Sequence, residues 1–350
     1  MIHIIAPIHL CFLHKIYKGL TPINRKTSRP PYSNPMKTIL VTGGAGFIGS
    51  NLINRLMKDP HNFIICIDDL STGSLKNISH HKSSPRFAFQ LHNIIDPIQL
   101  PVFNRIDEIY HLACPASPDK YKSDPLRTLN TSITGTQNVL EICLMHRATM
   151  VFTSTSEVYG DPQVHPQPET YYGNVNTVGE RSCYDEGKRA AETMIYEFRK
   201  KHQLDIKIVR LFNTYGPNMD INDGRVITNF IKQIMKNEPV VIYGDGTQTR
   251  SFCYIDDMVD ALMQTMASDE QGPMNLGNPD CEFTLNSLVG IFEGILNKKL
   301  EVSYIEKTQD DPTQRKPVIA KAQEAIGWHP EVKLEEGLER TMNYFANMQV

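Results

Sequence analysis

Residues 37–49 read Lys37-Thr-Ile-Leu-Val-Thr-Gly-Gly-Ala-Gly-Phe-Ile-Gly49. Thr38–Thr42 is rich in β-branched residues and predicts a strand, whereas Ile48, Leu52 and Leu56 recur every four residues and predict a helix. Glycines between a strand and a helix allow a tight turn, and they let a pyrophosphate approach the free N–H groups at the start of the helix. The segment therefore predicts a unit that binds a dinucleotide.

An acidic residue supports this interpretation, since a glycine-rich turn alone also arises by chance or for packing. The next predicted strand, Phe63–Asp68, ends about 20 residues beyond the glycines, at Asp68. A carboxylate at this place binds the ribose hydroxyls of the adenosine and repels a 2′-phosphate, so the sequence favours NAD over NADP. Asp69, beside it, is either a further contact or a solvated turn residue.

The pattern of short β-branched runs and helical stretches continues to about residue 213. It predicts a doubly wound parallel sheet of the Rossmann type, an α/β fold in which crossover helices link the strands. The predicted helices beyond the first are Leu126–Leu144 and Tyr184–His202. The predicted strands are Thr38–Thr42, Phe63–Asp68, Glu108–Ala113, Met150–Ser154 and Ile206–Phe212.

The regularity loosens after Asn213, which predicts a smaller C-terminal α/β region that binds the substrate. We expect residues 36–213 to form the NAD-binding domain and residues 214–350 the substrate-binding region, with part of 239–268 packing back on the first domain. The elements predicted here are a helix at Val226–Asn237, a strand at Val240–Tyr243, a helix from Leu285 capped by Thr284, and a last helix at Lys333–Met348.

Composition narrows the classes of partner. The chain has 350 residues and a net charge of −3, without long basic runs, so we expect neither nucleic acid nor a stable membrane association but a small-molecule substrate. The first 35 residues hold five basic residues and no acidic one. We interpret residues 1–35 as a disordered extension or as upstream sequence before a start at Met36. A targeting peptide or membrane anchor is the alternative, although Ile4–Leu13 is too short to span a bilayer.

The seven cysteines form no Cys-x-x-Cys pair. They therefore indicate neither a zinc site nor a disulfide framework, and we expect no metal. Free cysteines usually act as small buried hydrophobes and are typical of a reducing compartment such as the cytoplasm.

Tyr184 and Lys188 stand four residues apart and share one face of a predicted helix. A nearby ammonium lowers the pKa of a phenol, so Tyr184 can act as a general base, and Lys188 can also bind the cofactor ribose. An ordinary pair on a helix surface is the alternative. The preceding strand ends in the run Ser154-Thr155-Ser156-Glu157, which brings a hydroxyl and a carboxylate to the sheet edge where ligands bind.

Several longer runs carry a family resemblance. Residues 36–348 resemble the extended short-chain dehydrogenase/reductase family, and within it the UDP-glucuronate decarboxylases. The runs are His111-Leu-Ala-Cys-Pro-Ala-Ser-Pro118, Ser154-Thr-Ser-Glu-Val-Tyr-Gly-Asp-Pro162, Gly173-Asn-Val-Asn176, Arg181-Ser-Cys-Tyr-Asp-Glu-Gly-Lys-Arg189, Phe212-Asn-Thr-Tyr-Gly-Pro217, Asp223-Gly-Arg-Val226, Gly244-Asp-Gly-Thr-Gln-Thr-Arg-Ser-Phe252 and Asp310-Asp-Pro-Thr-Gln-Arg-Lys-Pro317.

The resemblance implies a homodimeric carboxy-lyase that converts UDP-glucuronate into UDP-xylose with tightly bound NAD. Tyr184 would take the proton of the sugar 4-hydroxyl while hydride passes to NAD⁺, with Thr155 bonded to the same oxygen. The resulting β-keto acid would lose CO₂, and the returning hydride would complete the cycle. Glu157 would assist proton handling near C5, and Arg315 would hold the substrate.

The resemblance also implies a set of binding residues. Arginine suits a diphosphate because its planar fork stays charged, whereas a structural ion pair is the alternative role. The implied substrate contacts are Asn213, Arg225, Arg250, Tyr243 and Asn130. The implied cofactor contacts are Gly43, Gly46, Phe47, Ile48, Gly49, Asp68, Asp69, Thr72, Gly73, Asn93, Leu112, Thr131, Tyr184 and Lys188.

Other functions remain as alternatives. The 4,6-dehydratases of this family carry Asp where this chain has Ser156, and the 4-epimerases lack the carboxylate at Glu157. A non-catalytic protein that binds NAD or a nucleotide sugar is the third possibility. Asn130 replaces a lysine that relatives have near the substrate carboxylate. Arg127 could compensate only if the chain there is not regularly helical or its side chain curls back.

Overall fold

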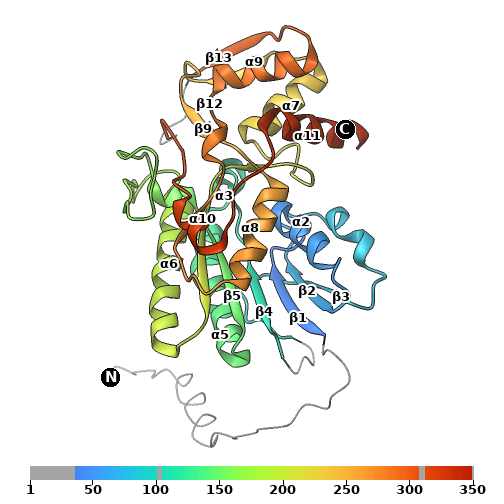
Figure 1. The fold of residues 1–350 in the computed structure, drawn as a ribbon, viewed down its shortest axis with the longest axis vertical. Helices are drawn as coiled ribbons and strands as arrows, with labels where there is room; N and C mark the ends of the chain where they lie inside the picture. The colour runs from blue at the N-terminus through green and yellow to red at the C-terminus, as the bar shows by residue number, and fades with distance from the viewer. Residues whose placement is uncertain (1–35, 101–104, 307–311, 349–350) are drawn as a thin grey trace, which may run out of the picture. The chain divides into compact units, whose positions relative to one another are not determined.

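A seven-stranded parallel sheet lies at the centre of the computed structural model, which describes residues 36–100, 105–306 and 312–348 (Figure 1). The predictions for residues 1–35 lie outside the described residues. The chain builds the sheet outward from β1 to β3 and then returns to the other side of β1, so the predicted doubly wound fold is confirmed. The strand order is β11 (Met274–Leu276), β6 (Ile206–Leu211), β5 (Thr149–Thr155), β4 (Glu108–His111), β1 (Lys37–Thr42), β2 (Asn62–Asp68) and β3 (Phe87–Leu91).

Helices cover both faces of the sheet. Alternate residues of β1 point to opposite sides, so that Val41 packs into one hydrophobic core and Leu40 into the other. On the first face lie α2 (Phe47–Leu56) and α8 (Ile255–Ala267), which contact each other. On the second face lie α5 (Thr136–His146) and α6 (Ser182–His202). Because both faces are buried, the strands read as nearly continuous apolar runs.

The predicted helix Leu126–Leu144 is interrupted in the structure. It consists of α4 (Pro125–Asn130), a π-helical turn over Thr131–Gly135, and α5. Asp124 caps α4 by accepting a hydrogen bond from the Arg127 N–H at 3.1 Å. A π-helical turn changes the register of the side chains that follow it, and such turns are frequent at functional sites.

The C-terminal residues add small sheets and helices above the carboxyl edge of the main sheet (Figure 1). The strand predicted at Val240–Tyr243 is present as β8, and Thr284 caps α9 by accepting a hydrogen bond from the Ser287 N–H at 3.0 Å. The strand pairs are β8 with β13 (Val302–Ile305), β9 (Thr249–Ser251) with β12 (Glu282–Thr284), and β7 (Thr214–Tyr215) with β10 (Cys253–Tyr254). The helices are α7 (Val226–Lys236), α9 (Leu285–Leu296), α10 (Ala320–Ile326) and α11 (Leu334–Asn347).

Two elements after residue 213 return to the main sheet: α8 packs on it and β11 pairs with β6. The division of the chain at residues 213 and 214 stays a prediction. None of the helices in the described residues carries an apolar stretch long enough to cross a membrane. The remaining short helices are α3 (Pro118–Ser123), η2 (Leu75–Asn77), η3 (Ser79–His81), η5 (Ser156–Tyr159) and η6 (Pro279–Cys281).

Candidate active site

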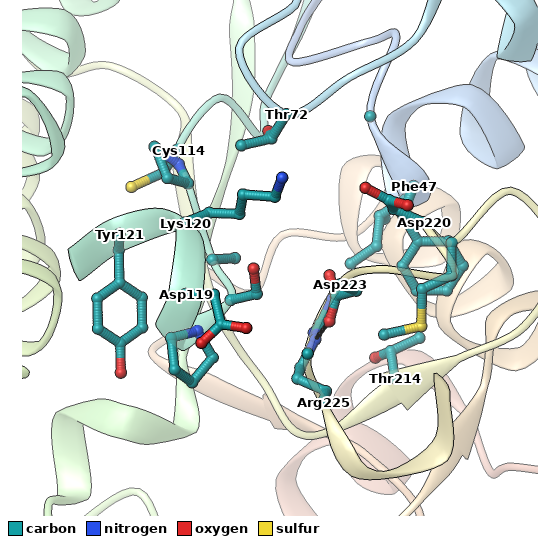
Figure 2. Close-up of a pocket in the computed structure, with 18 of the residues that line it drawn as sticks. Phe47, Thr72, Cys114, Asp119, Lys120, Tyr121, Thr214, Asp220, Asp223 and Arg225 are labelled. Carbon is teal, nitrogen blue, oxygen red and sulfur yellow. Dashed lines mark hydrogen bonds and ion pairs between the residues drawn. The ribbon is translucent and has the colours of Figure 1, made fainter. Parts of the chain in front are cut away.

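A cavity of about 710 Å³ opens at the carboxyl edge of the sheet, where α/β proteins bind their ligands. Its lining begins with Gly43 after β1 and Asp68 at the end of β2, continues to Thr155 at the end of β5, and reaches Tyr243 of β8. The cavity therefore joins the glycine turn to the C-terminal residues. Figure 2 shows part of it, with Tyr121 and Cys114 on one side and Phe47 and Asp220 on the other.

The turn after β1 requires glycine for steric reasons. Gly43 has φ +72°, in the left-handed region, and a Cβ on it would lie 2.8 Å from the Ala113 Cα. A Cβ on Gly49 would lie 2.7 Å from the Gly44 Cα and would overlap the Gly43 carbonyl oxygen. Gly46 is the N-cap residue of helix α2, and no side chain caps this end of the helix. Its first N–H groups therefore face the cavity, in an arrangement that suits the pyrophosphate of a dinucleotide.

Asp68 ties the glycine turn to the loop after β2. Its carboxylate accepts hydrogen bonds from the N–H groups of Ala45 at 2.9 Å and Leu70 at 2.8 Å. Burial raises the pKa of Asp68, and these N–H groups oppose that rise. The neighbouring Asp69 accepts a hydrogen bond from Arg127 at 2.7 Å, and both residues line the cavity. The two carboxylates thus lie at the end of the cavity predicted to hold the adenosine.

Most of the other residues predicted to bind the cofactor also line the cavity. Asn93 does not, although its neighbours His92 and Ile94 do. The Asn93 side chain accepts a hydrogen bond from the Ile95 N–H at 3.0 Å, which turns it toward its own loop. The residues that the structure brings to the cavity are Phe47, Ile48, Thr72, Gly73, Leu112 and Thr131.

Tyr184 and Thr155 meet inside the cavity. Tyr184, from α6, is 5% exposed, and its phenol is hydrogen-bonded to the Thr155 side chain at the end of β5. Burial raises the pKa of Tyr184, and the hydrogen bond to Thr155 lowers it by less. The expectation of a lowered Tyr184 pKa is therefore corrected, because desolvation of the phenolate dominates.

Lys188 lies one turn after Tyr184 on the inner face of α6 and is buried. Its ammonium donates a hydrogen bond to the Thr153 carbonyl oxygen at 2.8 Å and lies 4.8 Å from the centre of the Phe152 ring. Burial lowers the pKa of Lys188. The amine is thus fixed against β5 at the cavity wall, beside the tyrosine.

Glu157 forms the centre of a buried ionic cluster. Its Oε2 atom lies 2.6 Å from Arg181 Nη2 and 3.4 Å from Arg315 Nη2. Burial raises the pKa of Glu157, but the guanidinium groups of Arg315, Arg181 and Arg250 together lower it to about 2. Glu157 is therefore ionised across the physiological range.

The structure does not bring Arg315 to the cavity lining. Its side chain is 1% exposed, and its guanidinium donates to the carbonyl oxygens of Ser156 and, at 2.8 Å, of Gly160. The carbonyl groups around η5 thus occupy Nη1 and Nη2 of the guanidinium that was expected to hold the substrate, whereas the buried Nε has no hydrogen-bond partner among the described residues. In this position Arg315 fixes the η5 turn and the Glu157 carboxylate.

Four of the five residues predicted to bind the nucleotide sugar line the cavity, and one does not. Asn213, Arg225, Arg250 and Tyr243 line the cavity. Arg225 Nη2 donates to Asp223 Oδ2 at 2.9 Å, and Figure 2 shows this pair inside the cavity. Asn130 is exposed and does not line the cavity. Arg127 does line the cavity, but an ion pair holds its side chain against Asp69, at the end predicted to bind the adenosine.

One basic and one aromatic residue of the cavity, Arg181 and Tyr121, were given no role from the sequence. Arg181 stands three residues before Tyr184, a helical spacing that places both on one face and that could have indicated it. Tyr121 stacks on Tyr184, and only the folded chain brings them together. Further cavity residues without a predicted role are Cys114, Asp119, Lys120 and Asp223.

Comparison with known proteins places this site in a family. The model of the NAD dependent epimerase/dehydratase family matches residues 39–277. The chain belongs to this family. It is 49% identical over 318 residues to UDP-glucuronic acid decarboxylase 5 of Arabidopsis thaliana, covering 88% of this chain and 92% of that protein. It is 45% identical over 309 residues to UDP-glucuronic acid decarboxylase 1 of Xenopus tropicalis, covering 88% and 72%.

Solved structures of epimerases share the fold over nearly their whole length. UDP-N-acetylglucosamine 4-epimerase from Methanobrevibacter ruminantium M1, in complex with UDP-N-acetylmuramic acid, has a TM-score of 0.82 and 29% identity, covering 90% of this chain and 99% of that one. UDP-glucuronic acid 4-epimerase from Bacillus cereus, in complex with UDP-glucuronic acid and NAD, has a TM-score of 0.79 and 28% identity, covering 89% and 99%.

Proposed function

We propose that this chain is an NAD-dependent carboxy-lyase that converts UDP-glucuronate into UDP-xylose and CO₂. The observation that carries the proposal is the 49% identity to a UDP-glucuronic acid decarboxylase over 92% of that protein's length. The cavity supports it, because Thr155, Glu157 and Tyr184 line one wall beside the glycine turn.

The cofactor is NAD, and the glycine turn fits it. Gly43, Gly46 and Gly49 leave room for a pyrophosphate at the start of α2, and Asp68 offers a carboxylate to ribose hydroxyls. When bound, NAD would supply the acceptor and later the donor of the hydride at C4 of the sugar. Lys188 is the residue that we expect to contact the nicotinamide ribose from the cavity wall.

Tyr184 and Thr155 perform the first proton transfer in this proposal. The Tyr184 phenolate takes the proton of the sugar 4-hydroxyl, and the Thr155 hydroxyl donates a hydrogen bond to the same oxygen. Burial disfavours the phenolate, so nearby positive charge is needed to stabilise it. The guanidinium group of Arg225 lowers the pKa of Tyr184, and we assign the same effect to Lys188, one turn along α6. The 4-ketone that results is β to the C5 carboxylate.

Loss of CO₂ requires only that the enolate oxygen be stabilised. The electron pair of the breaking bond moves onto the C4 oxygen, which accepts hydrogen bonds from Thr155 and from the now protonated Tyr184. Glu157 is ionised, with its pKa lowered to about 2, and so it cannot supply a proton itself. We propose instead that Glu157 and Arg181 orient a water molecule that delivers the proton to C5 and takes up a replacing proton from the solvent.

The nucleotide part of the substrate is assigned to the C-terminal side of the cavity. Arg225 and Arg250 line it there and offer planar donors to a diphosphate. Asn213 and Tyr243 lie along the same wall. We assign to these four residues the binding of UDP, and to the cluster around Glu157 the selection of the sugar.

Epimerisation at C4 is the competing function, since solved 4-epimerases share the fold. Both reactions begin with the same oxidation, and they differ in whether the carboxylate leaves. Purified chain incubated with NAD⁺ and UDP-glucuronate is expected to release CO₂ and form UDP-xylose. A product that keeps the carboxylate, with its 4-hydroxyl inverted and without CO₂, would contradict the proposal.

We also propose that the chain is a cytoplasmic homodimer. The six cysteines in the described residues are free, as is typical of a reducing compartment. Exposed apolar side chains on neighbouring helices support a self-association surface: Met145 of α5 is 75% exposed and Tyr196 of α6 is 49% exposed. Light scattering of the purified chain tests the dimer, and a mass of one chain at micromolar concentration would contradict it.

A further inference from the structure

A buried carboxyl group next to Tyr184 has no part in the proposed reaction. Asp185 is 6% exposed and does not line the cavity. Its Oδ1 atom makes no hydrogen bond to any described residue, and its Oδ2 atom lies 4.0 Å from Arg181 Nε. An ionised carboxylate is normally buried only with hydrogen-bond donors on both oxygens. The surroundings of Asp185 therefore favour the neutral acid.

The groups facing Asp185 come from several elements. Glu157 of η5 and Glu186 of α6 oppose its ionisation, and Arg181 and Arg315 favour it. Burial has the largest effect, and together these influences raise the pKa of Asp185 to about 8. Helix α3 adds Tyr121, a neutral phenol whose buried hydroxyl also lacks a hydrogen bond within the described residues. Cys183, the residue two before Asp185, is a neutral thiol that interacts with it.

The protonation state of Asp185 decides the net charge of the cluster. The cluster holds the guanidinium groups of Arg181, Arg250 and Arg315 around the Glu157 carboxylate, and an ionised Asp185 would add one more negative charge to it. Of these guanidinium groups, those of Arg181 and Arg250 line the cavity, and Arg181 stands three residues before Tyr184. A sugar carboxylate next to the 4-hydroxyl would approach Arg181 closely. The cluster would attract it more strongly while Asp185 is neutral.

We propose that Asp185 is a positioning residue that selects sugars bearing a carboxylate, because it takes up or keeps a proton when that carboxylate binds beside Arg181. The inference rests on the proposed function, in which the substrate is UDP-glucuronate. Proton binding and ligand binding are linked reciprocally: the new negative charge favours neutral Asp185, and neutral Asp185 favours the anion. A UDP-sugar without a carboxylate lacks this coupling.

Calorimetry on the unmodified chain with bound NAD tests the coupling directly. UDP-glucuronate is titrated near the pKa of Asp185, about 8, in two buffers that differ in their enthalpy of ionisation. UDP-glucose serves as the matched ligand without a carboxylate. We expect proton uptake with UDP-glucuronate and less uptake with UDP-glucose. Equal uptake for the two ligands, or none with UDP-glucuronate, would overturn the inference.

The pH dependence of KM for UDP-glucuronate tests whether Asp185 is the group that couples proton binding to substrate binding. From about pH 7 to about pH 9 the KM of the unmodified chain for UDP-glucuronate is expected to rise about fivefold to tenfold, as Asp185 loses its proton. Asp185→Asn, which stays neutral, should remove this rise. Glu186→Gln removes the same charge from a residue that pairs with Arg189 at 3.4 Å, and it should keep the rise.

The outcomes separate the inference from the function on which it rests. An Asp185→Asn variant whose KM rises with pH as in the unmodified chain would overturn the role of Asp185 while CO₂ release continues. Failure of the proposed function would appear differently, as no CO₂ from the unmodified chain at any pH.

Discussion

The ring of Tyr121 lies parallel to the ring of Tyr184, with centroids 5.1 Å apart and an interplanar angle of 4°. Tyr121 comes from α3 and Tyr184 from α6, so the stack joins the loop after β4 to the helix that carries the proposed base. Tyr121 is 1% exposed, and its hydroxyl has no hydrogen-bond partner among the described residues. The ring, not the hydroxyl, is therefore the part of Tyr121 that positions Tyr184.

Two substitutions of Tyr121 separate the effect of its ring from that of its hydroxyl. Tyr121→Ala removes the stacked ring and should lower the free energy of unfolding by about 3–5 kcal/mol. It should also lower kcat by about 10–100-fold, because Tyr184 loses its support. Tyr121→Phe keeps the ring and removes an unpaired buried hydroxyl, so it should raise the free energy of unfolding by about 1 kcal/mol. Urea denaturation and steady-state kinetics measure both. Equal effects of the two variants would contradict the positioning role.

Glu157→Gln is expected to destabilise the chain strongly. The change leaves Arg315 buried with its charge uncompensated, which should cost about 3–5 kcal/mol of unfolding free energy. Glu186→Gln is the matched control on α6, where a half-exposed glutamate pairs with Arg189, and its cost should stay below about 0.5 kcal/mol. Similar urea midpoints for the two variants would show that the cluster does not stabilise the fold.

The same cluster predicts a loss of stability in acid. The pKa of Glu157 is lowered from its usual 4.5 to about 2, so its contribution is complete above about pH 4.5 and is lost as the pH falls toward about 2. The shift corresponds to about 3 kcal/mol. Comparing urea denaturation of the unmodified chain and Glu157→Gln at about pH 6 and about pH 3 tests this. A difference that does not shrink in acid would contradict it.

Gly49→Ala should disrupt the cofactor turn. The added Cβ would lie 2.7 Å from the Gly44 Cα and would overlap the Gly43 carbonyl oxygen, both backbone atoms that cannot move away cheaply. Gly290→Ala is the control, since nothing lies within 4 Å of its Cβ on α9, and alanine there should stabilise the helix by about 0.5–1 kcal/mol. NAD content after purification measures the difference. Full NAD in Gly49→Ala would contradict the steric argument.

Asn130→Lys tests whether the missing lysine matters. The Asn130 side chain is exposed and outside the cavity, so a lysine there should change KM for UDP-glucuronate by less than about twofold. Steady-state kinetics at low salt measure this, because low salt exaggerates any charge effect. A KM lowered by about tenfold would mean that residue 130 reaches the substrate.

The sequence predicted the elements whose signals are local. The strand–turn–helix of residues 37–56 depends on steric demands within a few residues, and the structure has it at nearly the predicted bounds. Strands β3 and β11 were not predicted, since each pairs on a single side at the sheet edge and β11 has only three residues. The π-helical turn at Thr131–Gly135 was also not predicted, because helical periodicity continues on both sides of it.

The parts of the site that depend on tertiary packing were predicted less well. Arg315 carries the charge expected of a substrate ligand, but the path of the chain turns it toward η5. The spacing of Tyr184 and Lys188 gave their common helix face, whereas the rise in the Tyr184 pKa comes from burial that no local pattern reports. Asp185 reads as an ordinary polar residue of a helix and becomes unusual only beside Glu157 and Arg181.

In the proposed reaction one hydride leaves C4 of UDP-glucuronate and returns to the same carbon after CO₂ has departed. UDP-glucuronate labelled with deuterium at C4 and with carbon-13 in its carboxyl group tests this by mass spectrometry of gas and nucleotide products. We expect labelled CO₂, UDP-xylose that retains the deuterium, and neither product from Tyr184→Phe. A product that keeps the labelled carboxyl group, or UDP-xylose that has lost the deuterium, would contradict it.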